Sequence, residues 1–471
     1  MGKRPAYLKN KRGSYWVVSA VLAALVWLIY GYGNDFPLQP LVENSEFKNR
    51  GFQGRVEEIA VPEKGLTFYF MQENTNPLVA VSFIFDHAGT AYDPQDKQGL
   101  AMLAAASLKD GAGKYSAEML REEMAMRGIK LEFGADKDVF SGQMTAPKSS
   151  LPEAAEWLKL ILSRPRFEEK YLVSAKDQIL KVLETEKENP EKELALAFNR
   201  KIYGGHPYGR NPLGTPETVA ALRRSDLQDF AGRKFGRNNL YIGIAGDLTG
   251  KEAAELAGLI FGDLPEKAEV EPLEMPDIGW QQPGLNIRRG GGQNIAAFAA
   301  AGTCRQCEDF YPLYIANYLF GGAGLNSRLN QRIREKEGLT YGVYSALTLN
   351  DQANLLVAGF AATPEKFARA RELFLQEWQK AGETGFTEEE LRAAKDYLTA
   401  SYNLRFASIA GISDMLAYMQ KYDLGLDFLQ KRNGYVEGVT AEQLNRAAKK
   451  YFNDNLLQAG IGFFSEEGEN E

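Results

Sequence analysis

Histidine and cysteine are the side chains that most often hold a metal or attack a substrate, and this chain has few of either. Its two histidines, His87 and His206, lie far apart in the sequence. This count disfavours a metal site built from several imidazoles. His87 follows a predicted strand, and we interpret it as an exposed or hydrogen-bonded residue and not as a ligand.

The two cysteines, Cys304 and Cys307, form a single C-x-x-C pair. A zinc ribbon needs a second such pair, which the chain lacks. In an oxidising compartment the pair can close a tight disulfide. A redox centre is disfavoured because no thioredoxin-like βαβ pattern surrounds the pair, so we interpret it as incidental or structural.

A glycine-rich string, LFGGAGLNSRLNQRIREKEGLTYGVYSA over residues 319–346, is the sharpest motif of the second half. Its glycines predict a tight turn before a helix capped by Asn326 or Ser327. Gly338 ends this helix, and the next strand is expected over residues 339–344. A helix N-terminus can bind phosphate, but no Walker lysine follows, so the glycines alone favour a phosphate site only weakly.

The composition sets the broad class of the protein. The chain has 471 residues, of which 44% are hydrophobic and 25% charged, as in globular proteins. A net charge of −7 disfavours a general role in nucleic-acid binding. The length leaves room for two or three domains.

The N-terminus predicts a membrane anchor. Basic residues precede an uncharged run whose centre is YWVVSAVLAALVWLIY, and residues 15–32 approach the length that a membrane helix needs. The positive charge before the run predicts a cytoplasmic N-terminus and an exported globular part. A cleaved signal peptide is the alternative.

An internal repeat is the strongest sign of organisation. Residues 167–178, FEEKYLVSAKDQ, are similar to residues 386–397, FTEEELRAAKDY, and residues 227–244 are similar to 444–461 at nearly the same spacing. Two β-rich runs at 66–71 and 78–85 read as a hairpin. We therefore expect an α+β fold of two homologous domains, each a mostly antiparallel sheet covered by helices.

Two segments together resemble the pitrilysin/insulinase-type zinc metallopeptidases. Residues 98–113, QGLAMLAAASLKDGAG, resemble the helix that carries His-x-x-Glu-His in that family. Met102 and Ala106 take the histidine places, and Ala105 takes the glutamate place. Since methionine and alanine provide neither zinc ligands nor a base that activates water, the resemblance implies a degenerate zinc site and no metal held by this chain.

The second segment is the string SRL followed by R-E-x-x-G-L-x-Y within residues 327–341. In the family, an arginine and a tyrosine of this string hydrogen-bond a substrate carbonyl near the scissile bond. Arg334 and Tyr341 match these positions, and a guanidinium and a phenol are suitable donors. A surface ion pair for Arg334 and a half-buried Tyr341 on a strand are the structural alternative.

Two further segments match the family pattern without adding ligands. The segment GGHPYG over residues 204–209 resembles the family's G-H-P-Y, in which His206 has a structural place. An acidic cluster sits where the family has its downstream glutamate ligand, and without the histidines we interpret it as a solvated helix face: Glu184, Glu186, Glu188, Glu191 and Glu193.

This pattern resembles the non-catalytic subunit of the two-component bacterial members of the family. The resemblance implies a clamshell fold, a homologous catalytic partner that carries His-x-x-Glu-His and zinc, and a peptide substrate held between the two subunits. It places the protein at the inner (cytoplasmic) membrane with its globular part in the periplasm. A peptidase-derived scaffold with no part in proteolysis and a stand-alone hydrolase are the alternatives; the substrate and the partner's identity stay open.

The expected division of the chain follows from these observations. The segments are a basic tail (1–14), the membrane anchor (15–32), a tether (33–50), the N-terminal peptidase-like domain (51–263), a linker rich in proline and glutamate (264–285), the C-terminal domain with Arg334 and Tyr341 (286–466) and an acidic tail (467–471).

Overall fold

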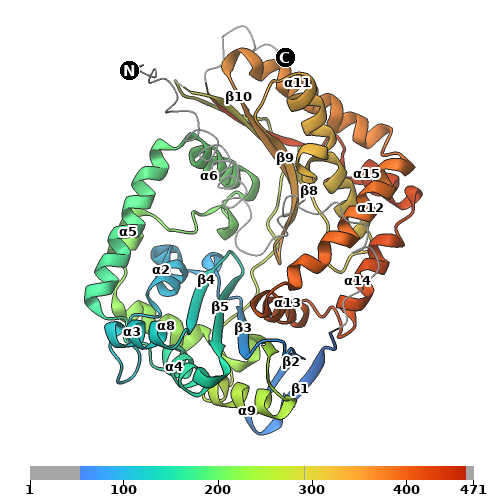
Figure 1. Ribbon diagram of the computed structural model, residues 1–471. Helices are drawn as coiled ribbons and strands as arrows, with labels where there is room; N and C mark the ends of the chain where they lie inside the picture. Colours follow the sequence, from blue (N-terminus) through green and yellow to red (C-terminus); the bar gives the residue numbers. More distant parts are fainter. Residues whose placement is uncertain (1–53, 291, 463–471) are drawn as a thin grey trace, which may run out of the picture.

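Two β-sheets, one from each half of the chain, are covered by helices in an α+β fold (Figure 1). The computed structural model describes residues 54–290 and 292–462. The predicted anchor, tether and acidic tail lie outside these residues. Within the described part of the chain, no helix is both long and apolar enough to cross a membrane.

The first sheet has six strands and is antiparallel except where β2 meets β6. Its spatial order is β1 (Glu57–Val61), β2 (Leu66–Gln72), β6 (Leu240–Gly246), β3 (Leu78–Asp86), β5 (Val139–Pro147) and β4 (Lys130–Ala135).

The predicted hairpin between β2 and β3 is wrong, although both strands exist. The strand β6 lies between them, with Tyr69 of β2 opposite Gly243 and Val81 of β3 opposite Ile244. A strand that is buried on both faces needs a central place in its sheet, and six of the seven residues of β6 are buried. The turn-forming cluster after β2 therefore connects strands that are two places apart.

The second sheet repeats this order without a counterpart of β1. Its strands are β7 (Leu285–Arg288), β11 (Leu457–Gly462), β8 (Asn294–Ala301), β10 (Asn354–Ala362) and β9 (Val343–Leu349). They correspond in turn to β2, β6, β3, β5 and β4, and the parallel pair recurs as β7 with β11. The internal repeat of the sequence is therefore a repeat of sheet topology.

Groups of helices lie between groups of strands along the chain in both halves. Those of the first half are α2 (Leu100–Ser107), α3 (Ala117–Met126), α4 (Leu151–Ser163), α5 (Glu169–Glu188), α6 (Pro190–Tyr203), α7 (Pro216–Ala221), α8 (Arg224–Lys234) and α9 (Gly250–Phe261). Those of the second half are α10 (Phe310–Asn317), α11 (Pro364–Glu383), α12 (Glu388–Tyr402), α13 (Ile409–Lys421), α14 (Phe428–Glu437) and α15 (Ala441–Tyr451).

Side chains alternate between the two faces of each sheet, as the strand period requires. In β2, Phe68 and Phe70 face the helices of the first half, whereas Tyr69 and Met71 face the opposite side. The second sheet is also buried on both faces, because its alternate residues belong to two separate apolar clusters.

The inner faces of the sheets are covered by an exchange of helices between the halves (Figure 1). The helix α13 of the second half packs on β2, β3 and β6, and Leu416 joins Met71 in one apolar cluster. The helix α6 of the first half packs on β8 and β11, with Phe198 beside Ala297. Each half therefore completes the core of the other.

Candidate functional site

The helix α2 carries the three positions at which the family resemblance places zinc chemistry. A buried carboxylate caps this helix: Asp93 accepts hydrogen bonds from the backbone N–H groups of Gly99 (3.0 Å) and Ala101 (3.1 Å). Gly99 has a φ of 91° before the first helical residue, which favours glycine. Burial raises the pKa of the Asp93 carboxyl to about 8, against the opposing effect of the N–H donors.

The positions that correspond to zinc ligands lie on this well-anchored helix but offer no ligand atom at neutral pH. Met102 is half-buried, Ala105 is buried and Ala106 is exposed. Met102 and Ala106 are four residues apart, so they share one face of the helix. The scaffold of the site is present, whereas the imidazole and carboxylate groups are not.

The acidic cluster spans the end of α5 and the start of α6, and the prediction of a solvated helix face is wrong for Glu186. Glu184 is exposed as predicted. Glu186 is buried and lies 3.6 Å from the Lys192 ammonium, and Glu193 pairs with Arg289. The sequence reasoning missed these pairs because α5 ends before α6 begins, so the cluster spans a bend and not one helix face.

A helical turn positions Arg334 in the second half. As predicted, Ser327 caps it: the Ser327 hydroxyl accepts a hydrogen bond from the Asn330 N–H at 3.4 Å. The Asn330 side-chain amide donates to the Val343 carbonyl at 2.6 Å and ties the turn to β9. Gly338, at φ 59°, ends the turn by donating its N–H to the Arg334 carbonyl at 3.0 Å.

Arg334 and Tyr341 both reach solvent. The Arg334 side chain is 40% exposed and lies 3.6 Å from its neighbour Glu335. Tyr341 is 64% exposed, unusually high for so large a ring. It precedes β9, which begins at Val343 and not at residue 339 as predicted. Both side chains are therefore accessible to a molecule outside the chain.

Within the chain, the Arg334–Tyr341 pair and the degenerate helix stay separate. The helix α2 packs on α5, α8 and β4 of its own half.

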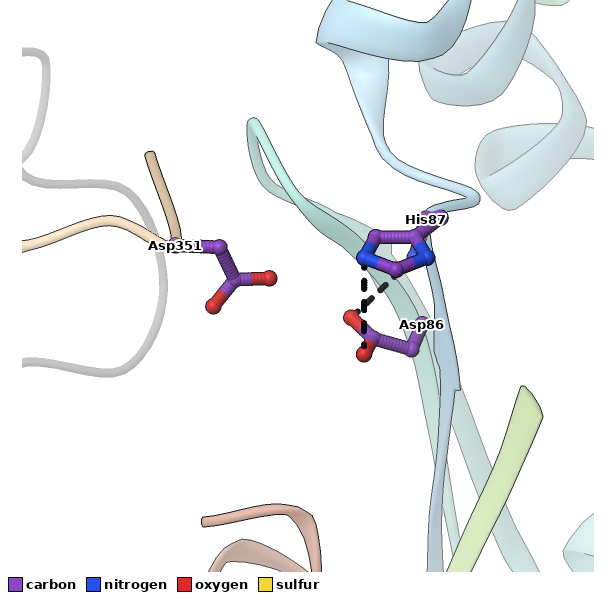
Figure 2. A group of neighbouring side chains, drawn as sticks. All are labelled: Asp86, His87 and Asp351. Carbon is purple, nitrogen blue, oxygen red and sulfur yellow. Dashed lines mark hydrogen bonds and ion pairs between the residues drawn. The ribbon is translucent and has the colours of Figure 1, made fainter. Parts of the chain in front are cut away.

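The structure assembles one group with the donor types of a metal site, and the sequence reasoning did not foresee it. Asp86, His87 and Asp351 each offer a ligand atom, and these atoms lie within 4.8 Å of one another (Figure 2). His87 has a φ of 56°, uncommon for a residue with a side chain. Nothing near Asp351 in the sequence marks it as a neighbour of β3.

A lysine ammonium already lies between the two carboxylates of this group. Lys421 Nζ is 2.6 Å from Asp86 and 2.9 Å from Asp351, and its side chain is only 5% exposed. Burial opposes the charge of Lys421, but the carboxylates of Asp351 and Asp86 outweigh it and raise the lysine pKa. The geometry therefore favours a buried ion triad that joins the halves over a divalent cation.

His206 has a structural place, as the resemblance implied. Its Nδ1 accepts a hydrogen bond from the Tyr208 N–H at 3.2 Å, and its Nε2 lies 3.0 Å from the Glu274 carbonyl oxygen. These contacts link the segment after α6 to the linker between the halves.

Two family models match consecutive parts of the chain. The first, insulinase (peptidase family M16), matches residues 69–216, and the second, the peptidase M16 inactive domain, matches residues 221–398. Together they span more than half of the sequence. The boundary between them falls just before α8.

Similar proteins include members described as proteases and one described as a non-peptidase. An uncharacterized zinc protease of Mycobacterium leprae is 28% identical over 298 residues, which span 61% of this chain and 65% of that protein. The match therefore spans slightly less than two thirds of the relative's length. The non-peptidase homolog YmxG of Helicobacter pylori is 25% identical over 393 residues, 82% of this chain and 90% of that protein.

The fold is also similar to a solved structure. A crystal structure of a peptidase M16 inactive domain from Pseudomonas fluorescens superposes with a TM-score of 0.81 at 25% identity. The match covers 87% of this chain and 98% of that one. Both sheets and the helices that cross between them therefore belong to a known architecture.

Proposed function

Since the chain belongs to the insulinase (M16) peptidase family, we propose that it is the non-catalytic, substrate-binding subunit of a heterodimeric zinc peptidase. The chain is a homologue of the inactive M16 domain and is not an active peptidase by itself. In the proposed pair, a homologous partner carries His-x-x-Glu-His and zinc, and this chain supplies Arg334 and Tyr341.

The observation that carries the proposal is the contrast between the two half-sites. Met102, Ala105 and Ala106 stand where a catalyst needs two histidines and a glutamate. Arg334 and Tyr341 are retained and exposed, although burial of a tyrosine ring would be the more favourable state in an isolated chain. Because both donors are exposed, they support binding of a molecule outside the chain.

The chemistry of the pair fits peptide hydrolysis. Hydrolysis of a peptide bond with a zinc ion held by the partner would place negative charge on the peptide carbonyl oxygen. The Arg334 guanidinium and the Tyr341 hydroxyl are donors that would stabilise this charge. Neither residue needs to transfer a proton for this effect, and the partner's glutamate is the base in the proposal. An edge strand of the partner would hold the peptide by adding it to a sheet.

The proposal also places the complex at a membrane. The apolar run at residues 15–32 supports a single N-terminal anchor with the globular part exported into the periplasm. Cys304 and Cys307 form a disulfide, which suits an oxidising compartment.

The experiment is recovery of the partner from solubilised membranes with the full-length chain as bait. Under the proposal, a homologue with an intact His-x-x-Glu-His is recovered, and a fluorogenic peptide library is cleaved by the mixture but by neither chain alone. Recovery of no such homologue would favour the scaffold alternative. Chelator-sensitive cleavage by the purified chain alone would overturn the proposal in favour of a stand-alone hydrolase.

A further inference from the structure

A cavity of about 580 Å³ lies between the two halves, within the usual size of small-molecule sites. One wall is formed by β3, β4 and β5 of the first sheet. The other wall is formed by α10, α13, α14 and the end of α12. Arg334, Tyr341 and Met102 are not among its lining residues, so the cavity is a site separate from the one proposed above.

The wall from the second half carries three arginines among aromatic rings. The Arg305 guanidinium lies 4.1 Å from the centroid of the Phe310 ring, and that ring stacks on Tyr314. The Arg432 guanidinium lies 5.8 Å from the Tyr314 ring. Arg305 and Arg432 therefore flank one ladder of rings, and Arg405 lines the same cavity.

Two of these cations have no carboxylate partner within residues 54–290 and 292–462. Arg432 is 6% exposed and donates to the Leu398 carbonyl at 2.8 Å and to the Asn433 side-chain oxygen at 3.1 Å. Arg305 lies over the rings of Phe310, Tyr311 and Phe428, and the hydroxyls of Tyr311 and Tyr418, which are neutral groups, also favour its charge. Burying positive charge without a counter-ion is costly, so the wall favours an anion inside the cavity.

The pKa of Arg405 reflects the positive charge beside it. Burial, and after it the positive charge of Arg432, lower the pKa of Arg405 to about 10. Arg405 therefore lies close enough to Arg432 for their positive charges to repel each other.

A buried hydroxyl without a hydrogen-bond partner also favours a ligand in this cavity. The Tyr402 hydroxyl lines the cavity side of α12, is buried and has no hydrogen-bond partner among the described residues. Its ring lies 4.2 Å from the Arg432 guanidinium. A buried polar group without a partner is uncommon in folded proteins and marks a place where a ligand atom or water belongs.

The carboxylates that line the cavity do not fill this role, because they already have donors within reach. Asp414 accepts from the Ser82 hydroxyl at 2.6 Å and from the Gln143 amide at 2.7 Å. Asp136 accepts from two backbone N–H groups at 2.8 Å. The Lys421 ammonium, which also lines the cavity, is held by its own two carboxylates.

We propose that this cavity binds a carboxylate attached to an apolar or aromatic body, with the carboxylate between Arg305 and Arg432 and the body against the rings of Phe310, Tyr314 and Phe428. Guanidinium groups match carboxylates in shape and charge. The carboxyl groups of Asp136 and Asp138 on the opposite wall disfavour the anionic end there and so fix the orientation of the ligand. Both the free C-terminus of a peptide and a small organic acid present this chemistry.

A disulfide holds one of the two anion-binding residues in place. Arg305 lies inside the four-residue loop that the Cys304–Cys307 disulfide closes, and the Gln306 amide of the same loop donates to the Tyr422 carbonyl at 2.8 Å. The disulfide joins the two ends of the loop, and the Gln306 hydrogen bond holds the loop beside the cavity. The Arg305 guanidinium therefore loses little conformational entropy when a ligand binds.

The test uses the full-length chain alone, without a catalytic partner, so its outcome is independent of the proposed function. Calorimetry compares N-acetylphenylalanine with its C-terminal amide, and a peptide that ends in phenylalanine with the same peptide amidated. We expect each acid to bind at least tenfold more tightly than its amide. Binding of the small acid but not of the peptide acid identifies the source as an organic acid; binding of both identifies a peptide C-terminus. Equal affinity of acids and amides, absence of binding, or tighter binding of inorganic phosphate than of any carboxylate overturns the proposal.

Matched variants locate the site. Arg305→Gln is expected to weaken binding of the acid at least tenfold and to leave the affinity for the amide unchanged. Arg328→Gln is the control, because its guanidinium lies over the Phe386 ring at 4.2 Å but is already paired with Glu390. An equal loss in both variants would contradict the assignment. Circular dichroism shows whether each variant is folded, and the comparison of acid with amide on the unmodified chain decides the proposal even if a variant is not.

Discussion

Asp138 accepts a hydrogen bond from the backbone N–H of Asp351 at 3.0 Å. The two residues belong to corresponding turns of the repeat, because Asp138 lies between β4 and β5, and Asp351 between β9 and β10. The turns meet where the two halves touch. Tyr208 reinforces the contact, since its hydroxyl donates to Asp138 and accepts from the Gln352 N–H at 3.2 Å. The duplicated halves are thus joined through equivalent elements.

The packing of α13 on β6 predicts that a single added methyl group will destabilise the contact between the halves. A Cβ atom on Gly243 would lie 2.1 Å from the Ser413 carbonyl oxygen and 2.5 Å from the Ala417 nitrogen. We expect Gly243→Ala to lower the free energy of unfolding by about 1–3 kcal/mol, measured by guanidinium denaturation. Gly232→Ala is the control: it lies on α8 with nothing within 4 Å, and we expect a gain of about 0.5–1 kcal/mol. Equal stability of the two variants would show that α13 does not pack as described.

The ion triad between the halves predicts a large decrease in the free energy of unfolding when its cation is removed. Lys421→Met leaves the carboxylates of Asp86 and Asp351, which are 14% and 15% exposed, without a counter-ion. We expect a loss of about 3–5 kcal/mol in the free energy of unfolding. Lys431→Met, whose side chain is 58% exposed in a pair with Asp427, should change stability by less than about 0.5 kcal/mol. A loss in Lys421→Met no larger than in this control would contradict the buried triad.

The cap of α2 predicts a dependence of stability on pH. The folded-state pKa of Asp93 is raised to about 8, whereas an unfolded aspartate has a pKa of about 3.9. Between these values the folded chain holds a proton that the unfolded chain has lost, so the free energy of unfolding falls as pH rises. The slope from this group is at most about 1.4 kcal/mol per pH unit.

Denaturation curves from pH 4 to pH 9 measure this effect. Asp93→Asn retains an oxygen acceptor for the helix N-terminus but cannot titrate, so its stability should vary less with pH than that of the unmodified chain. Asp96→Asn, at an exposed position three residues later, should keep the original slope. If stability depends on pH in the same way in the unmodified chain and in Asp93→Asn, the raised pKa of Asp93 is contradicted.

The exposed pair predicts a loss of catalysis without a loss of folding. In the complex with a zinc-bearing partner, Arg334→Ala or Tyr341→Phe should lower kcat by about 10²–10³-fold, because each removes one donor to the developing oxyanion. The stability of the chain should stay within about 0.5 kcal/mol, since both side chains are on the surface.

Steady-state kinetics of the reconstituted pair on a fluorogenic peptide make this measurement. Arg332→Ala is the matched control on the same helical turn, because Arg332 pairs with Glu337 at 2.6 Å. Unchanged turnover in the Arg334 and Tyr341 variants would support a scaffold without a part in proteolysis.

Much of the fold and the main features of the site were readable in the sequence. The similarity of residues 167–178 to 386–397 predicted the duplication, and the β-rich runs at 66–71 and 78–85 predicted the strands β2 and β3. The absence of ligand atoms at Met102, Ala105 and Ala106 is a property of residue type and needs no coordinates. Local patterns determine such features because they depend on neighbours within one turn or one strand.

Only the tertiary structure decided which distant segments meet. The insertion of β6 between β2 and β3, the exchange of α6 and α13, and the pairing of Lys421 with Asp86 across 335 residues leave no periodic trace in the sequence. The same holds for Arg305 and Arg432, which are ordinary surface-type residues until the helices enclose them. The order of segments along the chain constrains such contacts only weakly, because the entropic cost of bringing two segments together rises slowly with their separation in the sequence. Burial of apolar surface and pairing of charges then determine which segments meet.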